Sequence, residues 1–349
     1  MAAAAPAPGL MARARKAAPG SAQPLAAQVF AQLADGRFHS GEDLARALKV
    51  SRSAVWKAVG ALRLLGASLE AVRNRGYRLD ASGEPLDARK IRRHLDEAVR
   101  TRVRALQTTW SIDSTNAALL KRASPPPGAS EVLLAECQSA GRGRRGRTWV
   151  AAPGGAICLS LNWTFPAVPE DLGALGLVIG VCVLRALKRL GMQGVQLKWP
   201  NDLLVHGKKL GGVLIELRAE TAGPAFVVIG IGLNVALGAQ PLRDIAASGI
   251  AATDLRSAGL AGAGRNAVAA ALIGECVAGL LEFEQGSLKP FIADWREADA
   301  LEGKAVNVSG ADGVASGMAR GIDVHGALLV ETREGVQRFI AGDVTVRPS

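Results

Sequence analysis

The chain carries the stretch Gly141-Arg142-Gly143-Arg144-Arg145-Gly146-Arg147-Thr148-Trp149, then the turn Val150-Ala-Ala-Pro153-Gly154-Gly155 and the apolar run Ala156-Ile-Cys-Leu-Ser-Leu-Asn-Trp163. Four arginines and three glycines occupy its first nine positions. Glycine lets a backbone approach a ligand closely, and the arginine side chain presents a planar fork of donors to phosphate or carboxylate. The stretch therefore predicts an anion-binding loop, which we call the Gly-Arg loop (residues 141–149), between two strands.

The Gly-Arg loop matches two nucleotide-binding motifs only in part. Its glycines satisfy G-x-G-x-x-G, and its first eight residues differ from a P-loop by Arg147 in place of lysine. Both motifs need a helix directly after the glycines, because the helix N-terminus meets the phosphates. A turn and a strand follow here instead, which argues against a Rossmann or P-loop fold. A merely solvated basic loop is the other alternative, and it would not explain the interleaved glycines or Trp149.

The size and charge of the chain indicate several domains and polyanionic partners. Its 349 residues have room for two or three domains, and the net charge of +11 with a pI near 10.0 favours DNA or nucleotides. The four cysteines lie far apart without a C-x-x-C pair, so the sequence supports neither a zinc site nor a disulfide framework, and a reducing cytoplasm fits. The longest uncharged apolar run, residues 172–184, is shorter than the ~20 residues that a membrane span needs.

Residues 1–24 consist mainly of Ala, Pro and Gly, with three basic residues and no acid. This composition predicts a disordered tail. A transit peptide is also basic and acid-poor, but these residues show no clear amphipathic face. An internal start at Met11 is an alternative beginning of the chain.

Residues 25–82 have the pattern of a winged helix-turn-helix. A short helix is expected over 25–34, a second is opened by the capping arrangement of Ser40 and Asp43, and a third is capped by Ser51 and ends at Gly66. The short connection between the second and third helices is typical of a helix-turn-helix. Two strands around the turn Asn74-Arg75-Gly76 would form the wing.

Polar and basic side chains lie off the apolar face of the third helix and along the wing, as phosphate and groove contacts require. The predicted DNA-binding residues are Arg52, Ser53, Lys57, Arg63, Arg73 and Arg75. A domain kept only for regulation or docking is the alternative.

The rest of the chain predicts an α+β domain over 83–300 and a small β-barrel over 301–349. Strands are expected near 103–106, 131–135, 156–163, 195–199, 212–217 and 226–234, and helices near 87–95, 117–122, 172–190, 266–284 and 290–297. A mixed sheet with helices on one side is the simplest packing of these elements. After Gly303, five short strands punctuated by glycine suggest the barrel.

Five motifs carry a family resemblance. In order they are Asp113-Ser-Thr-Asn116, Gln138-x-Ala-Gly-Arg-Gly-Arg-Arg-Gly-Arg147, Lys198-Trp-Pro-Asn-Asp202, Lys209-Leu-Gly-Gly-Val-Leu214 and Gly230-Ile-Gly-Leu-Asn234. Their order and spacing resemble those of bacterial biotin–protein ligases. With the winged helix in front and a small SH3-like barrel behind, the resemblance is to the bifunctional repressor/ligases of that family and runs from about residue 25 to the C-terminus.

The resemblance implies a reaction and its cofactors. Biotin and ATP would form biotinyl-5′-AMP with the help of Mg²⁺, and biotin would then pass to a lysine of the biotin carboxyl carrier protein of acetyl-CoA carboxylase. The expected partners are that carrier protein, operator DNA and a second copy of the chain when the adenylate is bound, and no membrane.

The resemblance also implies site residues by position. The biotin-binding set would be Ser114, Thr115, Asn116, Gln138, Arg142, Gly143, Arg144 and Lys209, of which Lys209, Arg144 and Arg142 would act in catalysis. The ATP and adenylate set would be Lys198, Asn201, Asp202, Gly230, Gly232 and Asn234, with Asp202 as the Mg²⁺ ligand. Ser114 has a second interpretation as a helix cap, and Lys208 could be only a solvated neighbour of Lys209.

One departure from the family concerns residues 235–253, which contain no aromatic side chain. Some members cover the adenine there with a tryptophan, so Ile250 or another aliphatic residue would have to serve. Three alternatives stay open: a ligase whose winged helix does not bind an operator, a relative that acts on lipoate or octanoate, and a sensor of a small acid without catalysis.

Overall fold

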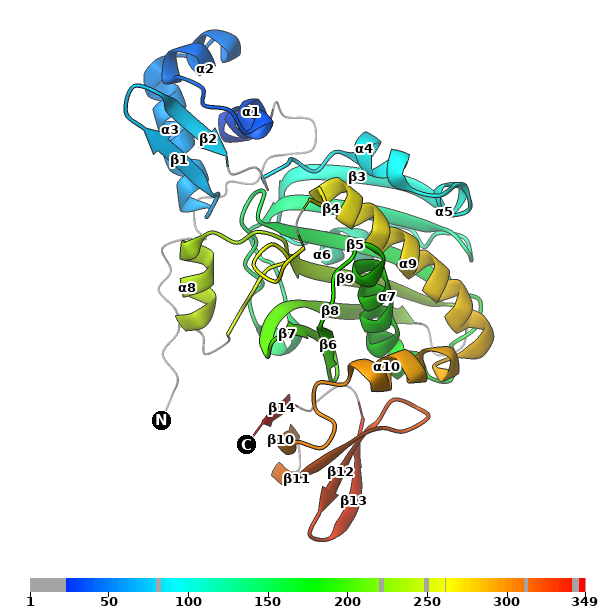
Figure 1. Ribbon diagram of the computed structural model, residues 1–349. Helices are drawn as coiled ribbons and strands as arrows, with labels where there is room; N and C mark the ends of the chain where they lie inside the picture. The colour runs from blue at the N-terminus through cyan, green and yellow to red at the C-terminus, as the bar shows by residue number, and fades with distance from the viewer. Residues whose placement is uncertain are drawn as a thin grey trace.

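A computed structural model describes residues 23–79, 83–219, 223–247, 251–260, 262–310, 313–340 and 345–348. Nearly all of the predicted N-terminal tail and Ile250 lie outside these ranges. The winged helix and the C-terminal sheet lie at opposite ends of a large central sheet (Figure 1).

The winged helix follows the predicted pattern closely. Its elements are α1 (Leu25–Gln32), η1 (Leu33–Asp35), α2 (Gly41–Leu48), α3 (Arg52–Leu64), β1 (Leu69–Val72) and β2 (Gly76–Leu79). The Ser40 hydroxyl accepts a hydrogen bond from the Asp43 amide and the Ser51 hydroxyl accepts one from the Ala54 amide, so both predicted caps are confirmed. Gly66 follows α3 with φ +84°, a conformation that glycine adopts without strain.

The central domain is built on a seven-stranded mixed sheet with the order β3-β4-β5-β9-β8-β7-β6. The strands are β3 (Val103–Ile112), β4 (Ser130–Gln138), β5 (Ala156–Phe165), β6 (Val195–Lys198), β7 (Asp202–Val205), β8 (Lys208–Ala219) and β9 (Ala225–Asn234). The β3–β4 pair is parallel and the other neighbouring pairs are antiparallel. The Gly-Arg loop and the turn after it connect β4 to β5, so no helix longer than the single turn η2 (Arg144–Gly146) follows its glycines.

Helices cover one face of this sheet, as the sequence predicts. They are α4 (Ala88–His94), α5 (Glu97–Arg102), α7 (Leu175–Arg189), which the turn η3 (Leu172–Ala174) precedes, α9 (Arg265–Gly286) and α10 (Ile292–Ala298), preceded by η4 (Lys289–Phe291). Their apolar residues form one cluster with those of the strands. The helix α9 is long and apolar enough to cross a membrane, but 67% of its apolar window is buried inside the protein, where it packs against α7 (Figure 1). We therefore interpret α9 as a core helix.

The opposite face of the sheet carries the short helix α6 (Thr115–Leu120). Leu119 packs there against Leu133 and Val228 in a small separate cluster. Most of this face is therefore not covered by helices, and we call it the open face.

The C-terminal region forms a five-stranded antiparallel sheet with the order β13-β12-β11-β10-β14. Its strands are β10 (Ala305–Gly310), β11 (Gly313–Ile322), β12 (Leu328–Thr332), β13 (Gly335–Phe339) and β14 (Thr345–Pro348). All five predicted strands are present. Among the residues that the structure describes, no pairing joins β13 to β14, so closure into an SH3-like barrel stays a prediction.

Three short elements escaped the sequence analysis. The strand β7 has only four residues, α5 has six, and α8 (Ala239–Ala247) lies in the segment that was expected to form a loop. The four residues of β7 and the six of α5 are too few to show a clear hydrophobic period, which is the main signal for secondary structure in a sequence. The strand β3 also extends six residues beyond the predicted end at residue 106.

Candidate active site

A row of aligned residues crosses the open face of the sheet. Strand pairing places in register Ala135, Cys158, Gly232, Gly212, Asp202 and Lys198. Because residues in register share one face, small side chains lie in the middle of this row and two charged side chains at its end. The row therefore has a middle of small side chains and an ionic end.

The polar start of α6 lies over the next row of the sheet. A Cβ atom on Gly230 would lie 2.4 Å from Asn116 Oδ1, so only glycine allows this approach. Ser160 Oγ lies 2.7 Å from Thr115 Oγ1 and 2.5 Å from Asn116 Oδ1. Gln138 Oε1 accepts a hydrogen bond of 2.8 Å from the Thr115 amide. The structure thus brings together three of the predicted biotin-binding residues, together with Ser160.

Ser114, the fourth residue of the α6 motif, caps the helix. Its hydroxyl accepts a hydrogen bond of 3.3 Å from the Ala117 amide. The second interpretation of Ser114, as a helix cap, is therefore confirmed, and a contact with biotin stays a prediction.

The Gly-Arg loop folds as a tight hairpin. The Trp149 amide donates to the Gly141 carbonyl at 2.9 Å, and the Gly143 amide donates to the Arg147 carbonyl at 2.7 Å. A Cβ atom on Gly232 would lie 2.5 Å from the Trp149 ring, so the indole packs directly against the backbone of Gly232. These contacts close the hairpin and place its tryptophan against the open face.

Two of the cations on this face are held by carboxylates. Arg142 from the loop pairs with Glu216 of β8 at 3.0 Å. Lys209 Nζ lies 2.6 Å from Asp202 Oδ1, and both side chains are about four-fifths buried. An anionic substrate could replace either carboxylate as the partner of the cation, so the face is suited to bind carboxylate or phosphate.

Asn234, which was predicted for the nucleotide side, lies near the Lys209–Asp202 pair through the segment that pairs with Lys209. The Lys209 amide donates to the Ala251 carbonyl at 2.7 Å, and the Thr253 amide donates to the Lys209 carbonyl at 2.9 Å. Asn234 Nδ2 donates to the Thr253 carbonyl at 3.0 Å, while the buried Asn234 Oδ1 has no partner among the described residues. A buried acceptor without a partner is costly, so Asn234 is a good candidate for a contact with a ligand.

Asn201 and Lys198 have different surroundings. The Asn201 side chain donates to the Val213 carbonyl at 2.7 Å and its carbonyl accepts from the Val213 amide at 2.9 Å, so Asn201 fastens the turn between β6 and β7 to β8. Lys198 lies directly opposite Asp202 in the sheet. An ATP contact of Asn201 and Lys198 stays a prediction.

Asp202 is suited to bind a metal ion that enters the site together with the phosphates of a substrate. The described residues contain no group of three or more His, Cys, Asp or Glu side chains that could hold a metal. Mg²⁺ is commonly held by one or two carboxylates together with substrate phosphates. Asp202 therefore suits an Mg²⁺ ion that arrives with a nucleotide, provided that Lys209 turns away from its oxygen.

Cysteine chemistry does not take part in this site. Burial raises the pKa of the Cys158 thiol to about 12 and that of the Cys137 thiol still further. Both thiols are therefore protonated at neutral pH and are poor nucleophiles.

The sequence analysis missed Ser160 and Glu216 as site residues, and it noted Trp149 without giving it a role. One local signal existed: Cys158, Ser160 and Asn162 alternate with apolar residues along β5, and such alternation predicts a strand with one polar face. The pairing of Glu216 with the loop left no local signal, because the two residues are 74 positions apart.

The winged helix presents its predicted DNA-binding residues at the surface. All six are exposed, and Trp56 of α3 is 68% exposed. The Arg75 guanidinium stacks over the Phe38 ring at 4.3 Å, which holds this wing arginine in place. Exposed cations on α3 and the wing match the arrangement that DNA phosphates require.

The fold and the cationic open face define an enzyme that handles anionic substrates, joined to a helix-turn-helix unit. Three family models match the chain: the Biotin/lipoate A/B protein ligase family over residues 109–234, an HTH domain over 26–78, and the Biotin protein ligase C terminal domain over 303–347. The chain belongs to the biotin–protein ligase family.

The similarity extends over nearly the whole chain. The bifunctional ligase/repressor BirA of Salmonella typhimurium is 38% identical over 315 residues, which are 90% of this chain and 95% of that protein. The biotin–[acetyl-CoA-carboxylase] ligase of Mycobacterium tuberculosis is 37% identical over 74% of this chain and 95% of its own length. A solved biotin protein ligase from Aquifex aeolicus, in complex with biotin and ATP, is 28% identical with a TM-score of 0.60, covering 70% of this chain and 100% of that one.

Proposed function

We propose that the chain joins biotin to ATP as biotinyl-5′-AMP and then transfers biotin to a lysine of the biotin carboxyl carrier protein. The main support is the placement of Lys209, Asp202 and the Gly-Arg loop on one face of a domain whose relatives are biotin ligases. The relative from Aquifex aeolicus, solved with biotin and ATP, supports the same pair of substrates.

In the first step a carboxylate oxygen of biotin attacks the α-phosphorus of ATP, and pyrophosphate leaves. Both reactants are anions, so the site has to offset the charge that gathers around phosphorus in the transition state. Thr115, Asn116 and Gln138 bind the polar ring and the carboxylate end of biotin. The Lys209 ammonium leaves Asp202 and binds one oxygen of the biotin carboxylate and one oxygen of the α-phosphate. It thereby holds the two reactants close together. Asp202 would hold Mg²⁺ together with the ATP phosphates, and the ion would supply further positive charge there.

In the second step the ε-amine of the carrier lysine attacks the biotinyl carbonyl, and AMP leaves. The mixed anhydride reacts with water and with unselected amines, so it has to be retained until the carrier docks. Arg142 and Arg144 of the Gly-Arg loop close over the adenylate, and Gly143 gives the loop the freedom to do so. Asn234 lines the nucleotide side, while Gly230 and Gly232 let Asn116 and Trp149 lie directly on the sheet.

ATP-dependent incorporation of labelled biotin into a lysine of the carrier protein tests this function. The purified chain should modify a single carrier lysine, and replacement of biotin by lipoate or octanoate should leave the carrier unlabelled. Preferred labelling with lipoate or octanoate would assign the chain to that related activity. Binding of biotin without release of pyrophosphate would make it a sensor.

A second function, repression of biotin synthesis genes, is favoured by the exposed cations of the winged helix. The turn that follows the Gly-Arg loop and the segment that follows Asn234 both lie close to the winged helix: a Cβ atom on Gly154 would lie 3.2 Å from Phe30, and one on Gly66 would lie 2.9 Å from Pro241 of α8. We infer that the adenylate orders these loops and favours a symmetric dimer, which reads two half-sites of an operator in the cytoplasm.

An electrophoretic shift on a biotin-synthesis promoter, with and without biotin and ATP, tests repression. Binding should strengthen with the two substrates and weaken steeply with salt, because Arg52, Lys57 and Arg73 contact phosphates. Carrier protein should reverse the strengthening, because it consumes the adenylate. Equal binding in both conditions would leave a DNA-binding protein without a switch, and no binding would leave only the ligase.

A further inference from the structure

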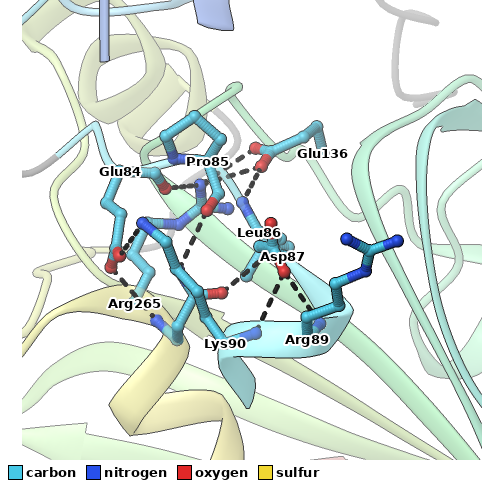
Figure 2. A network of polar contacts seen from close by, with 9 residues as sticks. Glu84, Pro85, Leu86, Asp87, Arg89, Lys90, Glu136 and Arg265 are labelled. Carbon is cyan, nitrogen blue, oxygen red and sulfur yellow. Dashed lines mark hydrogen bonds and ion pairs between the residues drawn. The ribbon is translucent and has the colours of Figure 1, made fainter. Parts of the chain in front are cut away.

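A buried ion pair outside the reaction site joins β4 to the start of α9. The Arg265 side chain, from a residue 1% exposed, places Nη1 3.0 and 3.1 Å from the two carboxylate oxygens of Glu136, from a residue 5% exposed (Figure 2). A buried pair of this kind usually stabilises a fold no more than apolar residues of similar volume would. The positions of its other hydrogen-bond partners therefore suggest a different role.

One set of partners belongs to the linker between the winged helix and the ligase domain, here defined as residues 84–87. The Leu86 amide donates to Glu136 Oε1 at 2.7 Å, and Arg265 Nη1 donates to the Glu84 carbonyl at 2.6 Å. The side chain of the neighbouring Asn266 adds two further bonds to this linker, and its backbone amide adds a third. The linker is thus fastened by side chains of the catalytic core.

The other set of partners belongs to the stem of the Gly-Arg loop, at the start of β5. The Gly154 amide donates to Glu136 Oε2 at 3.1 Å, and Arg265 Nη2 donates to the Ala156 carbonyl at 2.6 Å. The carbonyl of Gly155, between these two residues, accepts hydrogen bonds from the Val235 and Ala236 amides, which directly follow Asn234. The stem therefore borders the nucleotide side of the site.

The two sets meet on one carboxylate. Glu136 Oε1 receives the linker amide of Leu86, and Oε2 receives the loop amide of Gly154. If either amide moves away, its carboxylate oxygen keeps only the Arg265 guanidinium as a partner, and loss of a hydrogen bond to a buried charged group is costly in a low-dielectric interior. The positions of the linker and of the loop stem are consequently not independent.

We propose that the Glu136–Arg265 pair is the shared anchor that couples occupancy of the adenylate site to the linker of the winged helix. Both are positioning residues, because neither lies on the open face. This inference rests on the proposed function, since the ligands that order the loop are biotin and ATP. By reciprocity, DNA bound to the winged helix would affect the loop through the same anchor.

Hydrogen–deuterium exchange of the full chain, with and without biotin plus ATP, tests the coupling. In the unaltered protein the ligands should slow exchange of residues 141–155, and also of the Leu86 and Asp87 amides by at least about fivefold, the low end of typical couplings. In Glu136→Gln the side chain has one acceptor oxygen, so it can no longer accept from the Leu86 and Gly154 amides on two separate oxygens. The ligands should then still slow exchange in residues 141–155, but they should no longer slow exchange of the Leu86 and Asp87 amides. The double variant Glu136→Gln/Arg265→Met leaves no unpaired buried charge and should behave in the same way while staying folded.

Asn266→Ala is the matched control, because Asn266 binds the linker at the Pro85 carbonyl and the Asp87 amide and makes no bond to the loop. In this variant the linker amides should exchange faster without ligands, but biotin plus ATP should still slow their exchange. A full linker response in the double variant would overturn the anchor. A loop response without a linker response in the unaltered chain would also overturn it and leave the ligase intact, whereas no response in the loop would overturn the proposed function as well.

Discussion

The two faces of the central sheet use the same strands for different purposes. Along β5, Ile157, Leu159 and Leu161 face the helices and are completely or almost completely buried in the main core, whereas Cys158 and Ser160 lie on the open face, where they are also buried. On the helix-covered face large apolar side chains fill space. On the open face the side chains are small and polar, and Gly230 and Gly232 let Asn116 and Trp149 approach the backbone. Neighbouring residues of one strand can thus serve stability or chemistry according to the face they occupy.

Neighbouring substitutions on β5 give the largest expected difference between the faces. Leu161→Ala removes a fully buried side chain and should lower the free energy of unfolding by about 2–5 kcal/mol without changing the KM for biotin. Ser160→Ala should cost only about 1 kcal/mol and should raise that KM, because Thr115 and Asn116 lose a shared partner. Urea denaturation and steady-state kinetics measure both quantities. If the two variants lost the same free energy of unfolding and neither changed the KM for biotin, the proposed difference between the two faces would be wrong.

Lys209→Ala should slow adenylate formation by about 10²–10³-fold, the effect of removing one donor to a developing charge. Biotin binding should weaken but stay measurable, because Thr115 and Gln138 are unchanged. Lys208→Ala is the control, since Lys208 is an exposed neighbour. The measurement is pyrophosphate release after addition of biotin, and near-normal release by Lys209→Ala would remove Lys209 from the reaction.

Gly232→Ala tests how closely the open face is packed. The new Cβ atom would lie 2.5 Å from the Trp149 ring, and such overpacking typically costs about 1–3 kcal/mol. We expect this cost mainly as weaker binding of biotin and ATP, because Trp149 ends the Gly-Arg loop. Gly274→Ala in α9 is the matched control, since nothing lies within 4 Å of its added methyl group. Calorimetric titration with both substrates would show whether only the first variant loses affinity.

Arg144→Gly should release biotinyl-5′-AMP at least about tenfold faster, a change of roughly 1.4 kcal/mol. Without this side chain only Arg142 is left to anchor the loop to the bound anhydride. Arg145→Gly is the control in the same tip, because Arg145 has φ +55°, a conformation that glycine accepts without strain. Mass spectrometry of bystander proteins measures leakage, and labelling confined to the carrier lysine would show that Arg144 does not retain the adenylate.

The sequence predicted the local features of both faces and missed the contacts between distant segments. Caps such as Ser40 and Ser51, the loop connecting β4 to β5, and the winged helix follow from residues close together in the chain. The partner of Arg142 does not, because Glu216 becomes its neighbour only when β8 joins the sheet.

The buried anchor illustrates the same limit. Glu136 interrupts an apolar strand, which is a sign of a special role for a charged residue. Its partner Arg265 lies 129 positions away, so no local pattern could identify it. Physical reasoning from sequence finds an unusual charge more readily than it finds the charge that neutralises it.

The smallest expected effect lies outside the open face, where the C-terminal sheet meets the ligase domain. His325 Nδ1, in the turn between β11 and β12, lies 2.8 Å from Asp171 Oδ1, and Asp171 also accepts a hydrogen bond of 2.7 Å from Ser287. The hydrogen bond to Asp171 raises the pKa of His325 above 6.5. Burial opposes ionisation of Asp171, but the bonds from His325 and Ser287 outweigh it and lower the pKa of Asp171 below 3.8.

These directions define a pH window for the contact. The pKa of His325 is raised in the folded protein. Its contribution to the free energy of unfolding is therefore complete below the unfolded pKa of 6.5 and is lost as the pH rises through the folded pKa. That of Asp171 is complete above 3.8 and is lost as the pH falls. The thermal midpoint of the unaltered chain should therefore exceed that of His325→Ala slightly between these values, and the two should converge at alkaline pH. His94→Ala, a change at an exposed histidine of α4, should leave the midpoint unchanged across this range, and the ligation rate should be the same in all three proteins. A difference that grew with rising pH would contradict the pairing of His325 with Asp171, because a neutral imidazole lacks the charge that attracts the carboxylate.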